Sequence, residues 1–281
     1  MFEQNIGEYL SIDETCLSQG ELYTVLTNKS AKGKKGALIA MVKGTNSEVV
    51  KSIIEKIPLA KRRLVKEITL DMAPTMERIA KLCFPKATLV TDRFHVQKLA
   101  YDAVQEMRIN YRWDAIEQES LEIELAKEIR KKYIPAILEN GDTLKQLLAR
   151  SRYILFKSKS HWTPSQTHRA EILFRRYPLL ESAYNLAMQL GQIYSTTKTK
   201  GIAFTKLAQW YDRVDRSGFK SFNTIAKSIK DHYQTILNYF DRRSTNASAE
   251  SFNAKIKAFR SSFRGVKNIS FFLFRLSNIY A

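Results

Sequence analysis

The segment KEITLDMAPTMERIAKLCFPKATLVTD, from Lys66 to Asp92, decides the fold because it contains two apolar strands with a helix between them. The first strand ends at Asp71 and the second ends at Asp92. Pro74 fits the first turn of the helix, where a backbone N–H is not needed. The expected bounds are 65–70 for the first strand, 74 to about 83 for the helix and 87–91 for the second strand.

Three more strands and one more helix precede this segment. The first of these strands carries Asp13. The residues between the second and third strands, 28–36, are rich in Lys and Gly and predict a hairpin connection. The expected strands are Tyr9–Cys16, Leu22–Thr27 and Ala37–Val42, and the expected helix is Ser47–Ile57 with Ser47 as its N-cap. The order of elements is therefore βββαβαβ.

After residue 95 the apolar periodicity becomes helical and stays so to about residue 239. Two more helices are expected at the end, one from Thr245 or Asn246 to about Phe263 and one over Ile269–Tyr280. This is the order of an α/β ribonuclease H-like core, a mixed five-stranded sheet with helices, interrupted by a large all-α insertion. The expected parts are 1–95 for the start of the core, 96–240 for the insertion and 241–281 for the end of the core. A doubly wound sheet would need more β–α alternation after residue 95.

The charge balance indicates a polyanionic partner. Lys and Arg number 46 against 28 Asp and Glu, which gives a net charge of +18 over 281 residues. Nucleic acid is favoured over a membrane surface, because no polybasic run flanks an apolar span. The alternative is a protein that is merely soluble and basic.

The two cysteines, Cys16 and Cys83, form no CxxC pair, which argues against a zinc ribbon or a disulfide framework. Both are expected to be buried as small apolar residues. The sequence begins without the pattern of a signal peptide, and it contains no run of eighteen apolar residues. A cytoplasmic protein without a membrane segment is expected.

Two strands carry an aspartate that could do chemistry. Asp13 interrupts an apolar strand and Asp71 ends one, and a charge at such a position needs a partner, a metal ion or solvent. The alternative for Asp71 is a loop or capping residue ahead of Pro74. Either aspartate alone is a weak signal for metal binding.

The helix near residue 250 has two different faces. One face is apolar and predicts docking on a sheet, whereas the other has a single carboxylate, Glu250, among amides and cations. An ordinary solvated face is the alternative, but such faces usually mix acids and bases. The pattern suits a metal-binding glutamate beside groups that hold phosphate oxygens. The polar face comprises Asn246, Glu250, Asn253, Lys257 and Arg260, and the apolar face comprises Phe252, Ile256, Phe259 and Phe263.

Three carboxylates that converge would meet the needs of phosphodiester chemistry. Mg²⁺ prefers oxygen ligands, and two such ions roughly 4 Å apart can stabilise the attacking and leaving oxygens of an in-line displacement. A Ser or Tyr nucleophile is possible in principle, but no hydroxyl stands out. His95, three residues after Asp92, could contact the scissile phosphate or hold the site, or it could simply cap or pack at the start of a helix.

Three segments together resemble the ISL-three type of bacterial insertion-sequence transposase. They are SIDET around Asp13, LDMAPTMERIAKLCFPKATLVTDRFHVQKL from Leu70 to Leu99, and TNASAESFNAKIKAFRSSFRGVKN from Thr245 to Asn268. The second segment matches the family pattern D-M-x-P…FP-x-A…D-x-F-H-V, and the third resembles N-x-x-x-E-x-x-N-x-x-I-K. Order and spacing agree across nearly the whole chain.

The resemblance implies a metal-dependent enzyme that cleaves DNA and transfers the strands. Its triad would be Asp13, Asp71 and Glu250, holding two Mg²⁺ or Mn²⁺ ions on a ribonuclease H-like core. In that fold Asp92 would end the next strand outward, roughly 5 Å further across the sheet. We therefore expect Asp71 in the triad. Supporting or DNA-binding roles are expected for Asp92, His95, Asn246, Asn253, Lys257 and Arg260.

The same resemblance implies double-stranded DNA as partner, both element ends and target, and a homo-oligomer on that DNA in a bacterial cytoplasm, associated with the nucleoid. Similar transposases carry a zinc module and a helix-turn-helix before the catalytic domain, and this chain starts about a dozen residues before Asp13 with neither. A separate small DNA-recognition protein is expected to supply end recognition. The rival is a truncated chain.

Two other functions are compatible with these residues. A nuclease on the same fold would cut without joining, and a strand-transfer assay separates it from a transposase. An inactive DNA-binding remnant or regulator is the other alternative. All three carboxylates are present, which argues against a decayed, inactive protein. An assay for metal-dependent cleavage separates an active enzyme from such a remnant.

Overall fold

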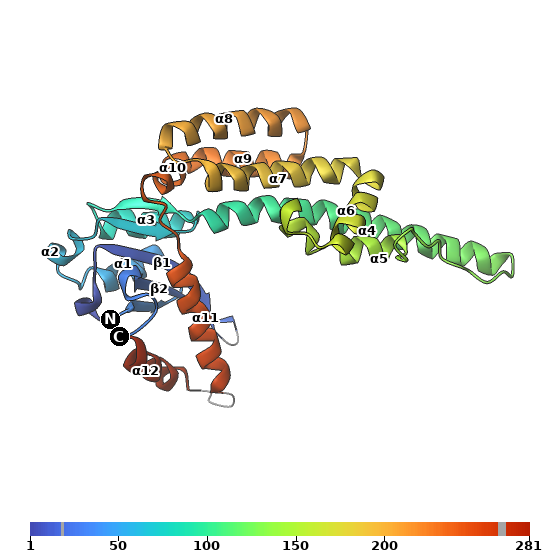
Figure 1. Cartoon of the computed structure of the whole chain (residues 1–281). Coiled ribbons are helices and arrows are strands. Elements are labelled where there is room, and N and C mark those ends of the chain that lie inside the picture. Colours follow the sequence, from blue (N-terminus) through green and yellow to red (C-terminus); the bar gives the residue numbers. More distant parts are fainter. Residues whose placement is uncertain (18–19, 264–267) are drawn as a thin grey trace. The chain divides into compact units, whose positions relative to one another are not determined.

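The structure is a computed structural model that describes residues 1–17, 20–263 and 268–281 (Figure 1). The chain divides into two compact units. Unit 1 contains residues Met1–Val96, Lys198–Lys200 and Ile229–Ala281, and unit 2 contains Gln97–Thr197 and Gly201–Ser228. The last part of unit 1 thus begins at Ile229, and the boundary at 241 expected from the sequence stays a prediction.

Unit 1 is built on a mixed five-stranded sheet in the order β3-β2-β1-β4-β5. Antiparallel pairs join β1 to β2 and β2 to β3, whereas β1 pairs with β4, and β4 with β5, in parallel. This topology excludes the doubly wound alternative and confirms the ribonuclease H-like core. The strands are β1 (Tyr9–Cys16), β2 (Leu22–Asn28), β3 (Leu38–Lys43), β4 (Glu67–Leu70) and β5 (Thr88–Thr91).

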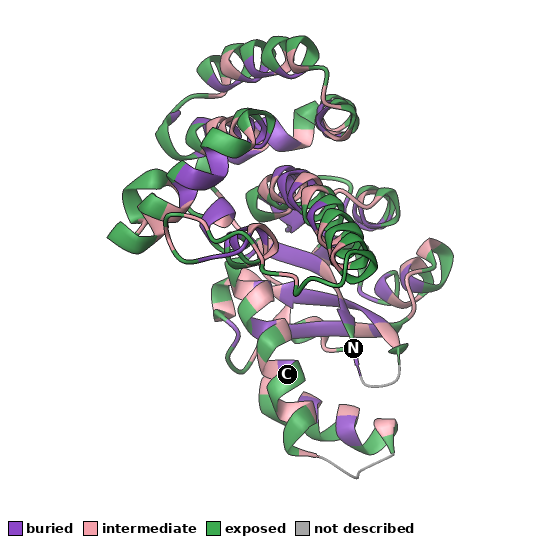
Figure 2. Ribbon diagram, turned by 90° about the vertical axis from the view of Figure 1, so that its right-hand side faces the viewer, coloured by how far each residue is buried: buried purple, intermediate pink, exposed green. Residues whose placement is uncertain are grey.

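Alternation of side chains along the strands gives the sheet two covered faces, and the strands are mostly buried (Figure 2). On one face Leu10 and Ile12 of β1 join a core with the helices α1 (Ser47–Ile54) and α3 (Pro74–Cys83). On the other face Val25 of β2 packs with Phe252 and Ile256. These two side chains belong to α11 (Ala247–Ser262), next to α12 (Ile269–Tyr280), and α10 (Tyr233–Arg242) contacts β5.

The regular elements of unit 2 are all helices among its described residues. Its core includes Trp210, whose indole N–H donates to the carbonyl of Leu186 at 2.9 Å, so that two of its helices are joined. Buried Asp142 pairs with Arg150 and Arg169. The helices of this region are α4 (Arg93–Glu128), α5 (Leu144–Arg150), α6 (Pro164–Arg176), α7 (Pro178–Thr196), α8 (Lys200–Ser217) and α9 (Lys220–Asp231), with short 3₁₀ turns at Ile154–Phe156 and Lys159–His161.

Several local expectations need correction. The N-cap of α1 is Asn46, whose side-chain oxygen accepts from the backbone N–H groups of Glu48 and Val49, and Ser47 is the first helical residue. Cys16 is exposed, whereas Cys83 is buried as expected. Elements that the sequence did not predict are α2 (Leu59–Arg62) and the 3₁₀ turns Glu3–Asn5 and Lys29–Ala31. Among the described residues, none of the helices is both long and apolar enough to span a membrane.

Candidate active site

The three strand aspartates lie at the same level of the sheet. Ser11 on β1 pairs with Thr69 on β4, so continuing the parallel register by two residues puts Asp13 beside Asp71. On the other side of β4, Leu70 pairs with Thr91, and one further residue puts Asp71 beside Asp92. Neighbouring strands are about 4.8 Å apart. Asp13, Asp71 and Asp92 therefore form a row across three adjacent strands.

Asp13 is partly buried and both of its carboxylate oxygens accept hydrogen bonds. Oδ1 accepts the backbone N–H of Glu14 at 2.8 Å, and Oδ2 accepts the side-chain N–H of Asn253 at 2.7 Å. Burial raises the pKa of Asp13 to about 6, and the negative charges of Asp71 and Asp92 act in the same direction. The Glu14 N–H and the charge of His95 oppose the rise. This carboxyl group thus carries its charge at a free-energy cost.

Asp71 forms a turn at the end of β4. Its Oδ1 accepts the backbone N–H of Ala73 at 2.9 Å, immediately before Pro74 opens α3. This is the loop role that the sequence left open, and it uses one of the two oxygens. The pKa of Glu14 is raised by burial and then by the charge of Asp71, which places the Asp71 carboxylate near the Asp13–Glu14 segment.

Asp92, His95 and Glu250 form a tight group in which potential metal-ligand atoms lie within 4.8 Å of one another. Asp92 is 1% exposed, and its Oδ2 is buried without a hydrogen-bond partner among the described residues. Burial raises the pKa of Glu250, followed by the charge of Asp92, while His95 opposes the rise. A buried carboxylate oxygen with no donor calls for a cation or a proton.

Asn246 fixes the start of α11 against the sheet. It is fully buried, its backbone N–H donates to Oδ1 of Asp92 at 3.1 Å, and the hydroxyl of Ser11 donates to its side-chain oxygen. Glu250 lies one turn further along the helix, and its backbone N–H donates to the Asn246 carbonyl at 2.9 Å. On the predicted apolar face of α11, Phe252 and Ile256 are buried, whereas Phe259 and Phe263 are partly buried. The contacts of Asn246 with Asp92 and Ser11 therefore fix the first turn of α11, and with it the position of Glu250.

A partly buried cation borders the row of aspartates, and its own position in the sequence does not single it out. The ammonium of Lys29, just after β2, donates to Thr69 at 2.6 Å and pairs with buried Glu67 at 3.3 Å. Burial lowers the pKa of Lys29, while the charges of Glu67 and Asp92 oppose this. Lys29 stands in a loop with three other lysines, so composition alone could not distinguish it. The only sequence signal for Lys29 was the presence of two polar residues, Glu67 and Thr69, in the buried strand β4, which need a partner.

The two predicted cations of α11 differ in their surroundings. Lys257 is exposed. The guanidinium of Arg260 lies over the Phe272 ring, 5.2 Å from its centroid. Lys255, which the sequence did not single out, donates to the carbonyl of Gly33 at 2.8 Å. Lys257 is thus the one of these three whose exposed charge is best suited to an external phosphate.

The donor set fits a hard divalent cation. Carboxylate oxygens from β1, from the ends of β4 and β5 and from α11 gather with one imidazole, and burial raises the pKa of two of the carboxyls, Asp13 and Glu250. A cation would offset the repulsion between these groups. Mg²⁺ and Mn²⁺ both prefer such oxygen ligands.

Comparison with known proteins gives one assignment. A family model described as a transposase, of the DDE ISL-three type, matches residues 10–276, which is nearly the whole chain. No curated protein and no solved structure matches the chain.

Proposed function

This chain belongs to the DDE transposases of the ISL-three type, and we propose that it cleaves and joins DNA strands at Asp13, Asp71 and Glu250. The proposal is supported by the origin of these carboxylates in three separate elements, β1, the end of β4 and α11. Asp13 and Asp71 are neighbours in the register of β1 and β4. The charge of Asp13 contributes to the raised pKa of Glu250, which supports a position of the α11 carboxylate near β1.

Asp13, Asp71 and Glu250 would hold two divalent ions, Mg²⁺ or Mn²⁺. When bound, such ions activate the attacking hydroxyl or water and stabilise the leaving oxygen. The free Oδ2 of Asp92 and the raised pKa values of Asp13 and Glu250 support a cation here. The protein's own contribution is to fix the carboxylates in place before the substrate arrives.

Asp92 and His95 act beside the triad in this proposal. Asp92 holds the first turn of α11 through the Asn246 N–H and adds negative charge to the site. His95, at the start of α4, has a ring nitrogen within 4.8 Å of carboxylate oxygens of Asp92 and Glu250. Its ring is positioned to contact a phosphate oxygen or to complete the ligand set.

DNA is the substrate that this charge distribution favours. The net charge of +18 attracts the phosphate backbone without regard to sequence. Lys257 adds an exposed cation two turns along α11 from Glu250. Phosphate contacts of this kind would hold a strand near the carboxylates and position it.

The test is a strand-transfer assay with a labelled duplex that contains the element ends, run with Mg²⁺, with Mn²⁺ and with a chelator. Asp13→Asn, Asp71→Asn and Glu250→Gln should each lower metal-dependent cleavage by about a thousandfold or more, because each removes a ligand and little volume. Glu48→Gln is the matched control, since Glu48 is an exposed acid that pairs with Arg78. Cleavage without joined product would indicate a nuclease. Full activity of all three variants would overturn the proposal.

A further inference from the structure

The C-terminal half of α4, in unit 2, presents a continuous acidic face. On a helix with 100° per residue, six exposed side chains fall within a sector of about 100°. Four of them are acids and two are leucines, Leu121 at 56% and Leu125 at 60% exposure. Lys127 lies outside this sector. We define the acidic face as Asp114, Glu117, Leu121, Glu124, Leu125 and Glu128.

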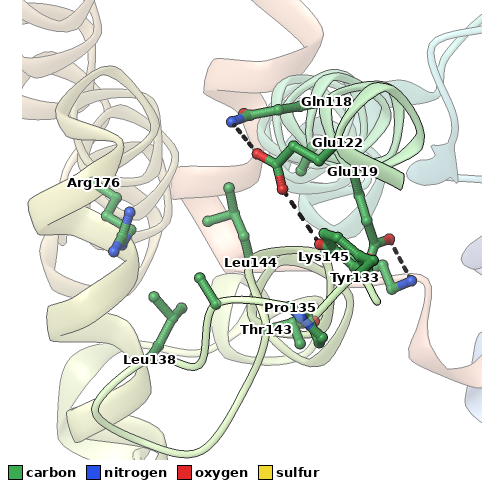
Figure 3. A pocket seen from close by; sticks show the side chains of 12 residues that line it. Gln118, Glu119, Glu122, Tyr133, Pro135, Leu138, Thr143, Leu144, Lys145 and Arg176 are labelled. Atoms are coloured by element: carbon green, nitrogen blue, oxygen red, sulfur yellow. Dashed lines mark hydrogen bonds and ion pairs between the residues drawn. The ribbon is translucent and has the colours of Figure 1, made fainter. Parts of the chain in front are cut away.

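The other side of the same helix segment is already used within unit 2. Glu119 pairs with Lys145 at 2.5 Å, and Glu122 accepts from the Tyr133 hydroxyl at 3.4 Å (Figure 3). These contacts line a pocket between α4 and the segment that leads into α5. They fix the rotation of α4, so that the acidic face is directed away from this packing.

The composition of the acidic face argues against contact with DNA. Residues 113–128 contain six acids and one base, in a chain whose net charge is +18. Phosphates would be repelled there. Exposed leucines surrounded by charges are typical of a protein-binding surface. The partner should be basic and partly apolar.

The chain itself contains a surface of that chemistry. Residues 251–281 contain six Lys or Arg and no Asp or Glu. On α12, Phe271, Phe274, Arg275 and Ile279 are exposed and share one side of the helix, which we define as the outer face of α12. Phe274 is 60% exposed. This face is apolar with one base, Arg275, whereas the acidic face is apolar with four acids around its leucines.

We propose that the acidic face of α4 binds the outer face of α12 in a second copy of this chain. A two-fold axis would create the contact twice, once in each direction. Leucine and phenylalanine side chains would form the centre, and Arg275 would be surrounded by glutamates. The dimer would assemble without DNA, and its formation does not depend on the catalytic proposal.

The first experiment measures the mass of nuclease-treated, full-length protein by sedimentation equilibrium over a range of concentrations and salt. A concentration-dependent dimer that weakens with added salt is expected. The double variant Glu117→Lys/Glu124→Lys and the variant Arg275→Glu should each raise the dimer dissociation constant by about tenfold or more. Glu171→Lys, at an exposed acid of α6 outside both faces, should leave it unchanged.

The second experiment mixes the two charge-reversed chains. In a reciprocal dimer one contact would then join two reversed faces and the other would join two unchanged faces. The mixture should therefore dimerise more tightly than either variant alone. Circular dichroism and thermal melting establish that both variants are folded. A monomeric wild-type chain at all concentrations, or a mixture that stays monomeric, would overturn the proposal.

Discussion

The carboxylate of Asp92 accepts the backbone N–H of Asn246 at 3.1 Å and so joins the end of β5 to the start of α11. The two residues are 154 positions apart in the chain. This bond brings together an aspartate at a strand end and the helix that carries Glu250. The part that Asp92 plays beside the triad can therefore be tested by separating its charge from its hydrogen bond.

Asp92→Asn keeps an oxygen that can accept the Asn246 N–H but removes the negative charge. If Asp92 acts through position alone, this variant should keep metal-dependent cleavage within about tenfold of the wild type, whereas Asp92→Ala should lose far more. Single-turnover cleavage rates measure both. An Asp92→Asn variant as inactive as Asp13→Asn, together with an active Asp71→Asn, would assign the metal to Asp92.

Ser11→Ala should destabilise the fold because it removes the hydroxyl that donates to the buried side chain of Asn246. A buried acceptor left without a donor costs about 1–3 kcal/mol. Urea unfolding, followed by a spectroscopic signal from unit 1, would measure the change in the free energy of unfolding. Ser52→Ala is the control, since the Ser52 hydroxyl is exposed and donates to a helix carbonyl. Equal stability of the two variants would show that the Ser11–Asn246 bond contributes little.

Asp13→Asn should stabilise the metal-free protein at pH 7. The pKa of Asp13 is about 6 in the folded chain against 3.8 for the unaffected group, so the folded state binds this proton more tightly than the unfolded state does. Stability from this group therefore rises as pH falls from about 6 to 4, and above pH 6 the charge costs at most about 3 kcal/mol. Thermal melts in a chelator at pH 7 and pH 4 should show an advantage for the variant only at pH 7.

Adding Mg²⁺ should reverse that order at neutral pH. The wild type gains binding free energy from the cation, and Asp13→Asn loses a ligand for it. A wild-type melting temperature that does not respond to Mg²⁺ would contradict the metal assignment.

Lys257→Ala should weaken binding to all duplexes alike and should lower the salt slope of log K by about one, as expected for one lost phosphate contact. Arg260→Ala should have a smaller effect on the slope, because the Arg260 guanidinium lies over Phe272. Fluorescence anisotropy at several salt concentrations measures both. Identical slopes for Lys257→Ala and the wild type would remove Lys257 from the DNA contact.

The sequence predicted the parts of the fold that depend on short-range pattern. The strands that end at Asp71 and Asp92 were visible because an apolar run stops at a charge, and the two faces of α11 were visible from helical spacing. The N-cap of α1 is Asn46, one residue before the predicted Ser47, because the two residues are adjacent and both are good caps.

What the sequence could not predict depends on residues far apart in the chain. Ser11 and Asn246 are 235 positions apart, and each is an ordinary polar residue until the fold joins them. Lys29 differs from its neighbouring lysines only through buried Glu67 and Thr69, some forty positions away. The closeness of Asp92 to Glu250 likewise follows from where α11 starts over the sheet. The choice of Asp71 as the second acid of the triad stays a prediction.

The hydrogen bond from Asn253 to Asp13 has a consequence for how the site responds to cations. The amide N–H donates to one carboxylate oxygen, and a carboxylate offers about four lone-pair sites. An ion at the proposed site would therefore bind Asp13 beside this amide. The Asn253 contact would keep the carboxylate attached to α11 in scarce cation, so that the geometry would already be assembled when metal arrives.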